Sequence, residues 1–515
     1  MLKFFYSLVF TLLSTFAIGQ TVVDIIVNSP VHTTLEAAVI AAELDDDLSA
    51  AGSFTVFAPT DDAFAALPAD FVNGLLANPT GQLADILTYH VINAQVLSGD
   101  LSDGQMAPTL QGEDVTVTIN TDGVFINNAL VTLVDIPATN GVVHVLDAVM
   151  LPPSFPTTVV DVVVNSDVHT TLEAAVIAAE LADDLSAAGP FTLFAPTDDA
   201  FAALPADFVN GLLANPTGQL ADILTYHAIG AQVLAGDLTD GQTAPTLQGE
   251  DVTVTIDANG VFINNAQVII TDIVTPNGVV HVLDAVMLPP SFPTTVVDVV
   301  VNSDVHTTLE AAVIAAELAD DLSAAGPFTL FAPTDDAFAA LPAGTVDLLL
   351  QDPTGDLAKI LLYHALGSQV LSSDLSDGQV ATTLLGQDID VTIDANGVFI
   401  NDAQVTVTDI VTLNGVVHVI DGVLLPELTN VKELEKVRMQ IFPNPTTDFI
   451  TIELPQEMWN TEVELQLMDM TGNILINQTI TDLRKTLNVG DYPSGNYMLL
   501  IKSGAQYALN KVIID

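Results

Sequence analysis

Cysteine is absent from this sequence of 515 residues, and only nine basic residues stand against 65 acidic ones. Without cysteine, disulfides, thiol nucleophiles and cysteine-ligated metals are excluded, so each folded domain must be stabilised by apolar burial. The residues are 50% hydrophobic, which is enough for globular domains. The net charge of −56 repels nucleic acid and anionic lipid, and this excludes nucleic-acid binding.

The acidic excess has two explanations. One is adaptation to a saline medium, where screening weakens the repulsion between like charges. The other is Ca²⁺ binding by carboxylates, within or between chains. The best local candidates are Asp45–Asp47 and the turn Asp257–Gly260, but neither has the alternating carboxylates and distal Glu of an EF-hand loop. Salt adaptation is therefore preferred, and no other cofactor is expected.

Catalytic and metal-binding motifs are missing. The nine histidines include no pair spaced i, i+2 or i, i+4, so no metal site is predicted. There is no G-x-S-x-G, no H-E-x-x-H and no glycine-rich phosphate loop. Asp61 and Asp62 follow Thr60 and are explained by helix capping. The sequence therefore predicts a protein that is not an enzyme.

Residues 1–19 have the pattern of a secretory signal peptide. Lys3 precedes the apolar run Phe4–Leu13, and small residues before Gln20 place the expected cleavage after Gly19. The run is too short to span a membrane, and no later run approaches 18 uninterrupted apolar residues. An exported protein with no transmembrane segment is expected.

One phrase organises the rest of the chain. FTVFAPTDDAFAALP occupies Phe54–Pro68 and returns almost unchanged from Phe191 and from Phe328, so the repeat length is 137 residues. That length suits a whole domain. Its residues predict a short strand ended by Pro59 and a helix that begins after the N-cap Thr60.

The remaining pattern in the first repeat favours an α+β fold, with helices first and strands mostly later. In chain order the expected elements are a strand at Val22–Val27, a helix after the capping-box pair Thr33 and Glu36 with Gly52 as its C′ residue, a helix at Leu83–Ile92, a hairpin of Val115–Ile119 and Val124–Ile126, and strands at Leu130–Val134 and Val142–Leu146.

The repeated phrase resembles the first signature of the fasciclin domain. Two further stretches agree, LTYHVI at Leu87–Ile92 and NGVVHVLDAVMLP at Asn140–Pro152, and both recur in each repeat. The resemblance covers residues 21–426 and implies wedges of β-strands packed with helices. It also implies that the Tyr-His stretch takes part in adhesion. The binding residues so implied are Tyr89, His90, Tyr226, His227, Tyr363 and His364. The alternative, which we prefer, is that Tyr89 packs in the core while its hydroxyl finds a partner.

The expected domains are three fasciclin domains at residues 20–152, 158–289 and 295–426, a charged linker at 427–438, and a C-terminal domain at 439–515. Proline-rich linkers such as Pro152–Pro156 should limit the angles between neighbouring domains. The third repeat departs from the others at Gly344–Val346 and Gln387–Ile389, and it holds Lys359, the one basic residue of the three repeats. A specialised contact is therefore expected there first.

Apolar and polar residues alternate in residues 439–515, which predicts a small all-β sandwich. Pro443–Pro445, Tyr492–Tyr497 and Lys511–Ile514 resemble the type A C-terminal sorting domain of the type IX secretion system of Bacteroidetes. The resemblance implies contact with that machinery through residues 439–515. It also implies removal of the tail, with the passenger anchored at the cell surface or released.

These features predict a secreted or cell-surface adhesion or matrix-interaction protein. Its partners would be surface or matrix proteins or glycans, or a second copy of the chain, and near-identical repeats would multiply weak contacts into avidity. The alternative is a structural spacer or surface-layer component without a specific ligand. Binding would be indicated by an exposed apolar patch at the same place in each repeat. The single tryptophan, Trp459, lies in the tail, so sugar stacking in the repeats would need Tyr or Phe.

Overall fold

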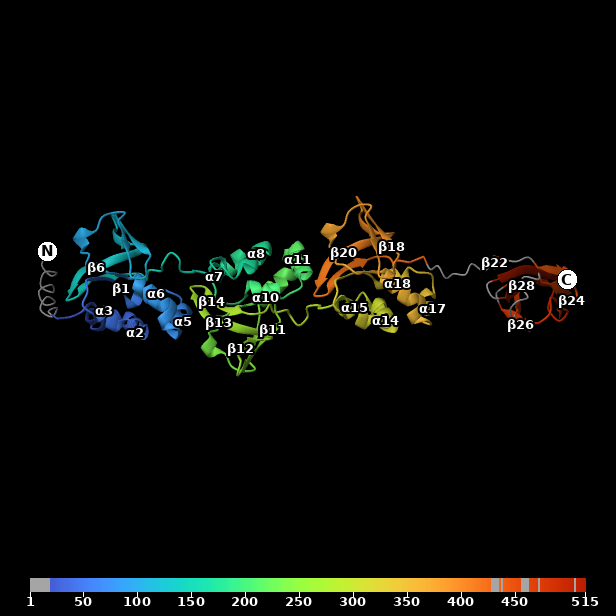
Figure 1. The fold of residues 1–515 in the computed structure, drawn as a ribbon, viewed down its shortest axis with the longest axis horizontal. Coiled ribbons are helices and arrows are strands. Elements are labelled where there is room, and N and C mark those ends of the chain that lie inside the picture. The colour runs from blue at the N-terminus through green and yellow to red at the C-terminus, as the bar shows by residue number, and fades with distance from the viewer. Residues whose placement is uncertain (1–18, 428–434, 437–438, 455–462, 471–472, 504–505) are drawn as a thin grey trace, which may run out of the picture. The chain divides into compact units, whose positions relative to one another are not determined.

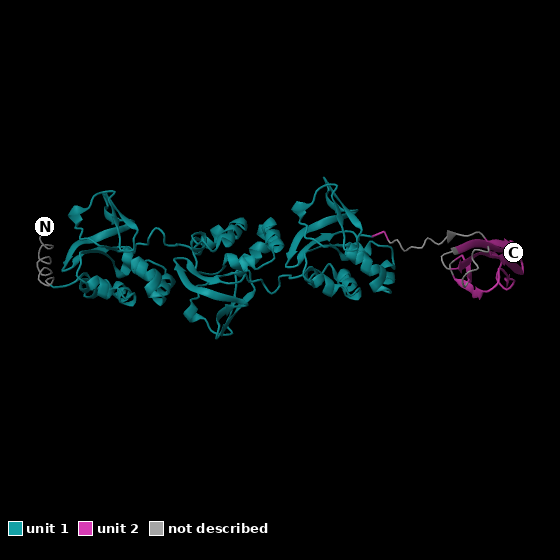
Figure 2. Cartoon of the chain, in the orientation of Figure 1, with its two compact units in different colours: residues 1–425 teal, residues 426–515 magenta. Residues whose placement is uncertain are grey.

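The computed structural model describes residues 19–427, 435–436, 439–454, 463–470, 473–503 and 506–515 (Figure 1). The expected signal peptide and most of the charged linker lie outside the described residues. The chain divides into two compact units, residues 1–425 and 426–515 (Figure 2). The first unit holds three copies of one α+β fold, as predicted, and the second is all-β.

The first domain has six helices and seven strands among its described residues. Its helices and helical turns are α1 (Val22–Val27), α2 (Thr33–Ala41), α3 (Asp45–Ser49), α4 (Asp61–Ala65), α5 (Ala69–Ala77), η1 (Pro79–Leu83), α6 (Ala84–Tyr89) and η2 (Ser98–Asp100). Its strands are β1 (Phe54–Pro59), β2 (Val91–Ile92), β3 (Met106–Pro108), β4 (Asp114–Asn120), β5 (Gly123–Ile126), β6 (Ala129–Ala138) and β7 (Gly141–Leu146).

The strands form one sheet in the order β2-β1-β7-β6-β5-β4-β3. β1 and β7 are parallel, with Phe54 opposite Gly141 and Pro59 opposite Leu146, while the other neighbours are antiparallel. The core has two parts. The helices bury one cluster around Phe71, and the sheet buries a second around Phe57 and Tyr89.

The signature phrase folds as predicted. β1 ends at Pro59, and the Thr60 hydroxyl accepts a hydrogen bond from the Ala63 N–H at 3.2 Å, which caps α4. Asp61 does more than its sequence position indicated, because its carboxylate also reaches the start of α2. It accepts from the Thr34 N–H at 2.7 Å and from the Thr33 hydroxyl at 2.9 Å. The phrase therefore ties two helices to the strand between them.

Three local predictions are wrong. Val22–Val27 is a helix instead of a strand, because Thr21 and Asp24 form a capping box that the β-branched composition concealed. α2 has no capping box at Thr33, since the carboxylate of Asp61 takes that role. Gly52 is not its C′ residue: α2 ends at Ala41, Glu43 adopts a positive φ of 56°, and α3 intervenes.

The helix expected at Leu83–Ile92 is shorter than predicted. α6 ends at Tyr89, and Val91–Ile92 becomes β2, which pairs with β1. No element was predicted for the stretch that forms α5. The strand expected at Leu130–Val134 extends to Ala138 as β6, with register irregularities that Asp135 accommodates at a positive φ of 57°.

The second domain repeats this fold. Its elements are α7 (Val159–Val164), α8 (Thr170–Ala178), α9 (Ala182–Ser186), β8 (Phe191–Pro196), α10 (Asp198–Ala202), α11 (Ala206–Ala214), η3 (Pro216–Leu220), α12 (Ala221–Tyr226), β9 (Ala228–Ile229), η4 (Ala235–Asp237), β10 (Thr243–Pro245), β11 (Asp251–Asp257), β12 (Gly260–Ile263), β13 (Ala266–Thr275) and β14 (Gly278–Leu283).

The third domain differs mainly at α17, which is shorter than α5 and α11. Its elements are α13 (Val296–Val301), α14 (Thr307–Ala315), α15 (Ala319–Ser323), β15 (Phe328–Pro333), α16 (Asp335–Ala339), α17 (Thr345–Leu349), η5 (Pro353–Leu357), α18 (Ala358–Tyr363), β16 (Ala365–Leu366), η6 (Ser372–Asp374), β17 (Val380–Thr382), β18 (Asp388–Asp394), β19 (Gly397–Ile400), β20 (Ala403–Thr412) and β21 (Gly415–Ile420).

Among its described residues the C-terminal unit has two sheets, with strand orders β22-β29-β28-β25-β26 and β23-β24-β27. Ile450, Leu465 and Leu499, from both sheets, share one buried core. The strands are β22 (Glu435–Lys436), β23 (Gln440–Phe442), β24 (Phe449–Glu453), β25 (Val463–Asp469), β26 (Ile474–Ile480), β27 (Arg484–Asn488), β28 (Gly495–Ser503) and β29 (Gln506–Ile514). The predicted small all-β domain is confirmed.

Candidate functional site

Tyr89, the first residue of the predicted binding pair, is fully buried at the C-terminal end of α6. Its hydroxyl donates to the Asp114 carbonyl at 3.0 Å and accepts from the Asn127 amide at 2.8 Å. Asn127 holds a positive φ of 52° between β5 and β6. Tyr89 therefore joins the helical part of the domain to the β4–β5 hairpin.

His90, the second residue of the pair, is 2% exposed. Its Nδ1 lies 2.7 Å from the Ile86 carbonyl, and its Nε2 accepts from the Met150 N–H at 3.0 Å. Nδ1 therefore carries the proton, and the ring is neutral. Burial lowers the pKa of His90 to about 4, although the hydrogen bond to Ile86 opposes the shift.

The same arrangement recurs in the second and third domains, where Tyr226, His227, Tyr363 and His364 are all buried. The structure thus places all six predicted residues inside the domain cores and gives each a structural contact. Their side chains present no surface to a partner. Whether the segments around them bind one stays a prediction.

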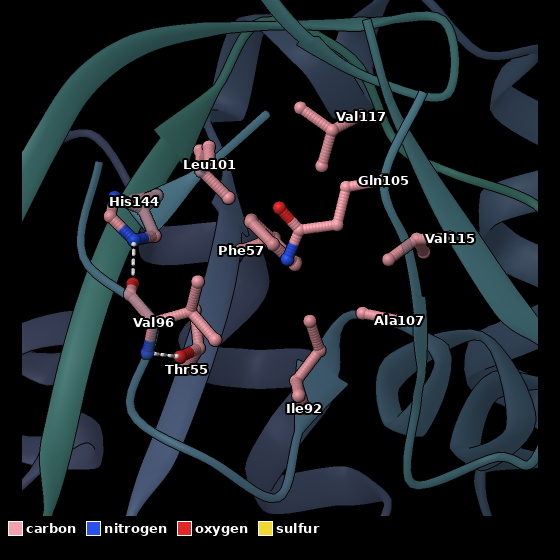
Figure 3. Close-up of a pocket in the computed structure, with 10 residues that line it drawn as sticks. All are labelled: Thr55, Phe57, Ile92, Val96, Leu101, Gln105, Ala107, Val115, Val117 and His144. Carbon is pink, nitrogen blue, oxygen red and sulfur yellow. Dashed lines mark hydrogen bonds between the residues drawn. The ribbon is translucent and has the colours of Figure 1, made fainter. Parts of the chain in front are cut away.

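The third histidine of the first domain, His144, lies on β7 beside a small cavity of about 10 Å³ (Figure 3). Its ring stacks on Phe57 with centroids 5.8 Å apart, and its Nε2 lies 2.9 Å from the Val96 carbonyl. Such a cavity holds about one water molecule. Three further cavities, each within the helical part of the first or second domain, measure about 10 to 20 Å³, which also leaves no room for an organic ligand.

In the described part of the chain, the carboxylates do not gather into a site. Asp45–Asp47 forms the first turn of α3, where negative charge stabilises a helix N-terminus. Asp257 accepts a hydrogen bond from the Asn259 N–H within its own turn. Among the residues that the structure describes, no three His, Asp or Glu side chains are arranged to hold a metal ion.

An exposed aliphatic pair does recur at one place in every fasciclin domain. In the first domain it is Val27, at the end of α1, and Ile40, on α2, which are 41% and 52% exposed. In the second domain Val164 and Ile177 line one of the small cavities described above, between α7 and α8. The pairs are Val27 with Ile40, Val164 with Ile177, and Val301 with Ile314. We call them the aliphatic pairs.

Each aliphatic pair is an exposed apolar patch at the same place in every fasciclin domain, which is the predicted sign of binding. The sequence did not reveal them, because the pattern of Val22–Val27 predicts a strand and no prediction was made for Ile40. Exposed large apolar side chains in the described parts of the three domains are all aliphatic or Met, such as Met106. No exposed aromatic ring is therefore available there for stacking on a sugar.

The family comparisons follow this architecture. The model described as Fasciclin domain matches residues 30–152, 167–289 and 304–426, and the model described as Secretion system C-terminal sorting domain matches residues 440–515. The chain therefore belongs to the fasciclin domain family. Its last domain is a C-terminal sorting domain of the type IX secretion system.

Curated relatives include transforming growth factor-beta-induced protein ig-h3 of Oryctolagus cuniculus, 32% identical over 408 residues, with coverage of 78% of this chain and 57% of the relative. Periostin of Homo sapiens is 29% identical over 397 residues, covering 75% of this chain and 45% of its own length. The chain thus spans about half the length of these relatives.

Among solved structures, the FAS1 domain pair of the insect cell adhesion molecule fasciclin I is 21% identical, with a TM-score of 0.27, and covers 50% of this chain and 95% of that one. In the present structure, no helix among the described residues is both long and apolar enough to cross a bilayer.

Proposed function

We propose that this is a secreted or surface-attached adhesion protein that binds protein partners through weak sites repeated on its three fasciclin domains. The observation that carries the proposal is the aliphatic pair, exposed at the same place in each domain. One pair offers too little apolar area for stable binding, but three on one chain act together through avidity. Membership of the fasciclin domain family agrees with this class.

The chemistry of the surface favours a protein partner over a glycan. The exposed apolar side chains of the fasciclin domains lack aromatic rings, whereas aliphatic side chains pack well against other aliphatic groups. Around them the surface is acidic, and Lys359 is the one basic residue between residues 21 and 426. A surface or matrix protein with apolar groups in a basic setting would fit best.

The sorting domain supports export to the cell surface or the medium. In this proposal the signal peptide directs the chain across the inner membrane, and residues 439–515 engage the type IX machinery at the outer membrane. Removal of both segments leaves the three fasciclin domains as the active product. No catalytic step is proposed for them.

The test uses beads coated with the full chain, mixed with beads that carry purified extracellular-matrix proteins and with beads of the same chain. Ca²⁺ is added and then chelated in each mixture. The variant Ile40→Ser/Ile177→Ser/Ile314→Ser removes the aliphatic pairs. The control Ile119→Ser/Ile256→Ser/Ile393→Ser changes exposed isoleucines on β4, β11 and β18, which are 37% to 40% exposed.

We expect clumping by the parent and by the control, and its loss in the first variant. Clumping that requires Ca²⁺ would make cation bridging part of the adhesion. Beads that stay dispersed with every partner would favour the alternative function, a structural spacer or surface-layer component without a specific ligand.

A further inference from the structure

Consecutive fasciclin domains meet through a two-point hydrogen bond. The Gln82 side chain, in η1 of the first domain, donates to the Val274 carbonyl on β13 of the second at 2.9 Å, and accepts from the Val274 N–H at 2.8 Å. The second junction repeats it. Gln219 donates to the Val411 carbonyl at 2.9 Å and accepts from the Val411 N–H at 2.7 Å.

Each junction also has a reciprocal contact from the following domain. Gln232 donates to the Asp70 carbonyl at 2.8 Å, and Gln369 donates to the Asp207 carbonyl at 2.7 Å. These bonds use uncharged amides, which suits domains that have almost no cations with which to form ion pairs. The same contact chemistry therefore occurs twice, with matching partners.

Close packing accompanies the hydrogen bonds. Val274 is 1% exposed and belongs to the apolar cluster around Phe71 in the first domain. It lies over Gly74 on α5, where an added Cβ would be 2.8 Å from its Cγ1. At the second junction an added Cβ at Gly211 would be 2.9 Å from Val411. Glycine is thus required at both places because the valine occupies the space of a side chain.

The third domain has a face that corresponds to the glycine and glutamine face of the first two domains, but it carries neither residue. Leu348 stands where the repeat places Gly74 and Gly211, and it is 66% exposed. Asp356 stands where the repeat places Gln82 and Gln219, and its carboxylate pairs with Lys359 at 2.7 Å. A carboxylate cannot donate to a backbone carbonyl, so the two-point bond cannot form.

The first domain has a face that corresponds to the valine face of the second and third domains, and there the valine is also replaced. Pro137 stands where the repeat places Val274 and Val411, and a proline has no N–H to donate to a glutamine. Leu97 on this face is 42% exposed, whereas its counterpart at the second junction, Leu371, is 8% exposed. Gly74, Gln82 and Val274 and their second-junction counterparts are therefore present at the internal faces, and other residues replace them at the outer faces. The reciprocal glutamine is kept on the outer face of the first domain as Gln95.

We infer that the two junctions are one specific fasciclin–fasciclin interface, and that Pro137, Leu348 and Asp356 block its outer faces against end-to-end addition of a second copy of the chain. Near-identical domains on a surface crowded with copies would otherwise meet through the same contacts. The inference does not depend on the adhesion function. It requires that any contact between copies use other surfaces.

The first test exchanges residues at the internal junction. Spin labels are attached at Thr121→Cys and Ala258→Cys, two exposed turns in a chain without other cysteines, and their separation is measured by pulsed electron resonance. Gly74→Leu, Gln82→Asp and Val274→Pro each install the residue that an outer face of the same fold carries. The fold therefore tolerates each residue type at that position.

We expect a narrow distance distribution in the parent and one about twofold broader in each variant, since the proline-containing linker alone then restrains the domains. Asn73→Leu, on an exposed neighbour of Gly74, is the control and should stay narrow. Circular dichroism verifies that each variant is folded. A broad distribution in the parent, or narrow ones in folded junction variants, would overturn the interface.

The second test restores the outer faces with Pro137→Val, Leu348→Gly and Asp356→Gln in one full-length chain. Sedimentation velocity is recorded over rising concentration at high salt, which screens the acidic repulsion. We expect the parent to stay monomeric and the restored chain to form head-to-tail oligomers. Gln82→Asp disrupts only an internal junction, so the restored chain that carries it should still form oligomers. A restored chain that remains monomeric would refute the blocking role of these three residues.

Discussion

The Nε2 atom of His90 accepts a hydrogen bond from the Met150 N–H at 3.0 Å, across 60 residues of chain. Because Nε2 must be unprotonated to accept it, the contact requires a neutral imidazole. The bond fastens the segment after β7 to the end of α6. His227 with Met287, and His364 with Leu424, repeat it in the other two domains.

The stability of the fasciclin domains should fall as the pH is lowered from about 6.5 to 4. In that window the unfolded histidine binds a proton and the buried one does not, so the free energy of unfolding decreases by up to roughly 1.4 kcal/mol per pH unit for each such histidine. Above pH 6.5 the histidine is neutral in both the folded and the unfolded state, so it adds no pH dependence to the free energy of unfolding. Urea unfolding at a series of pH values measures the slope.

The variant His90→Gln/His227→Gln/His364→Gln separates this effect from the titration of the acidic surface. We expect lower stability at pH 7, because the buried hydrogen bonds are disturbed, and a shallower loss between pH 6.5 and 4. An unchanged slope would show that other groups govern the acid sensitivity.

Substitution of Asp61 by alanine should lower the stability much more than substitution of the adjacent Asp62. Asp61→Ala removes the acceptor of the Thr33 and Thr34 hydrogen bonds and should cost about 1–2 kcal/mol, as loss of a helix cap does. Asp62→Ala is the matched control, since Asp62 is exposed and such surface changes cost within about 0.5 kcal/mol. Equal effects in thermal unfolding would contradict the link between α2 and α4.

Acid should also weaken the Asp61 contact. Burial opposes the shift, but hydrogen bonds from Thr34 and Thr33 hold the pKa of this carboxyl below its usual value. The stabilisation is therefore complete above the ordinary pKa of an aspartate and is lost as the pH falls through the lowered one. Asp61→Asn should remove this dependence and leave that of the histidines.

Tyr89→Phe tests the core role of the predicted binding pair. Loss of the hydroxyl leaves the Asn127 amide and the Asp114 carbonyl without this partner, at a cost of about 1–3 kcal/mol in the free energy of unfolding. At a temperature where the variant is fully folded, bead clumping should equal that of the parent. Clumping lost without unfolding would assign the Tyr-His stretch a direct part in adhesion.

The acidic surface should respond to ionic strength rather than to one cation. Melting temperatures should rise with NaCl, because screening reduces repulsion among the carboxylates. CaCl₂ at equal ionic strength should give the same increase, and titration calorimetry should show no stoichiometric Ca²⁺ binding. A larger shift with CaCl₂ would restore the hypothesis of a calcium site.

The sequence predicted the parts of the fold whose signals are local. Thr60 and Pro59 define a cap and a strand end within a few residues, and the structure confirms both. Val22–Val27 was misassigned because β-branched residues favour strands, while the capping box at Thr21 and burial against the sheet decide for a helix. Asp61 was recognised as a cap, but its partner α2 lies 28 residues away, and only the folded domain brings the two together.

The candidate site was less predictable. Burial of Tyr89 and His90 depends on strands that arrive much later in the chain, and local spacing carries no such information. The aliphatic pairs required a correct helix at α1 before Val27 and Ile40 could be placed on one side. For the junctions the repeats carried a partial signal, because the departure of the third repeat at Gly344–Val346 lies two residues before Leu348, which replaces the glycine of the other two domains. The contact itself was not predicted.

The parallel pairing of β1 with β7 has a consequence for how the chain must be made. Phe54 pairs with Gly141, so no domain can close its sheet until its last strand has emerged. The strand GVVHVL is identical in the first two domains, so β1 could equally pair with β14. Closing the longer loop costs only about 0.8 kcal/mol more. Correct strand pairing therefore depends on the order in which the strands become available. A domain that folds before the next domain is synthesised cannot exchange strands with it, whereas refolding of the whole chain from denaturant should produce exchanged strands.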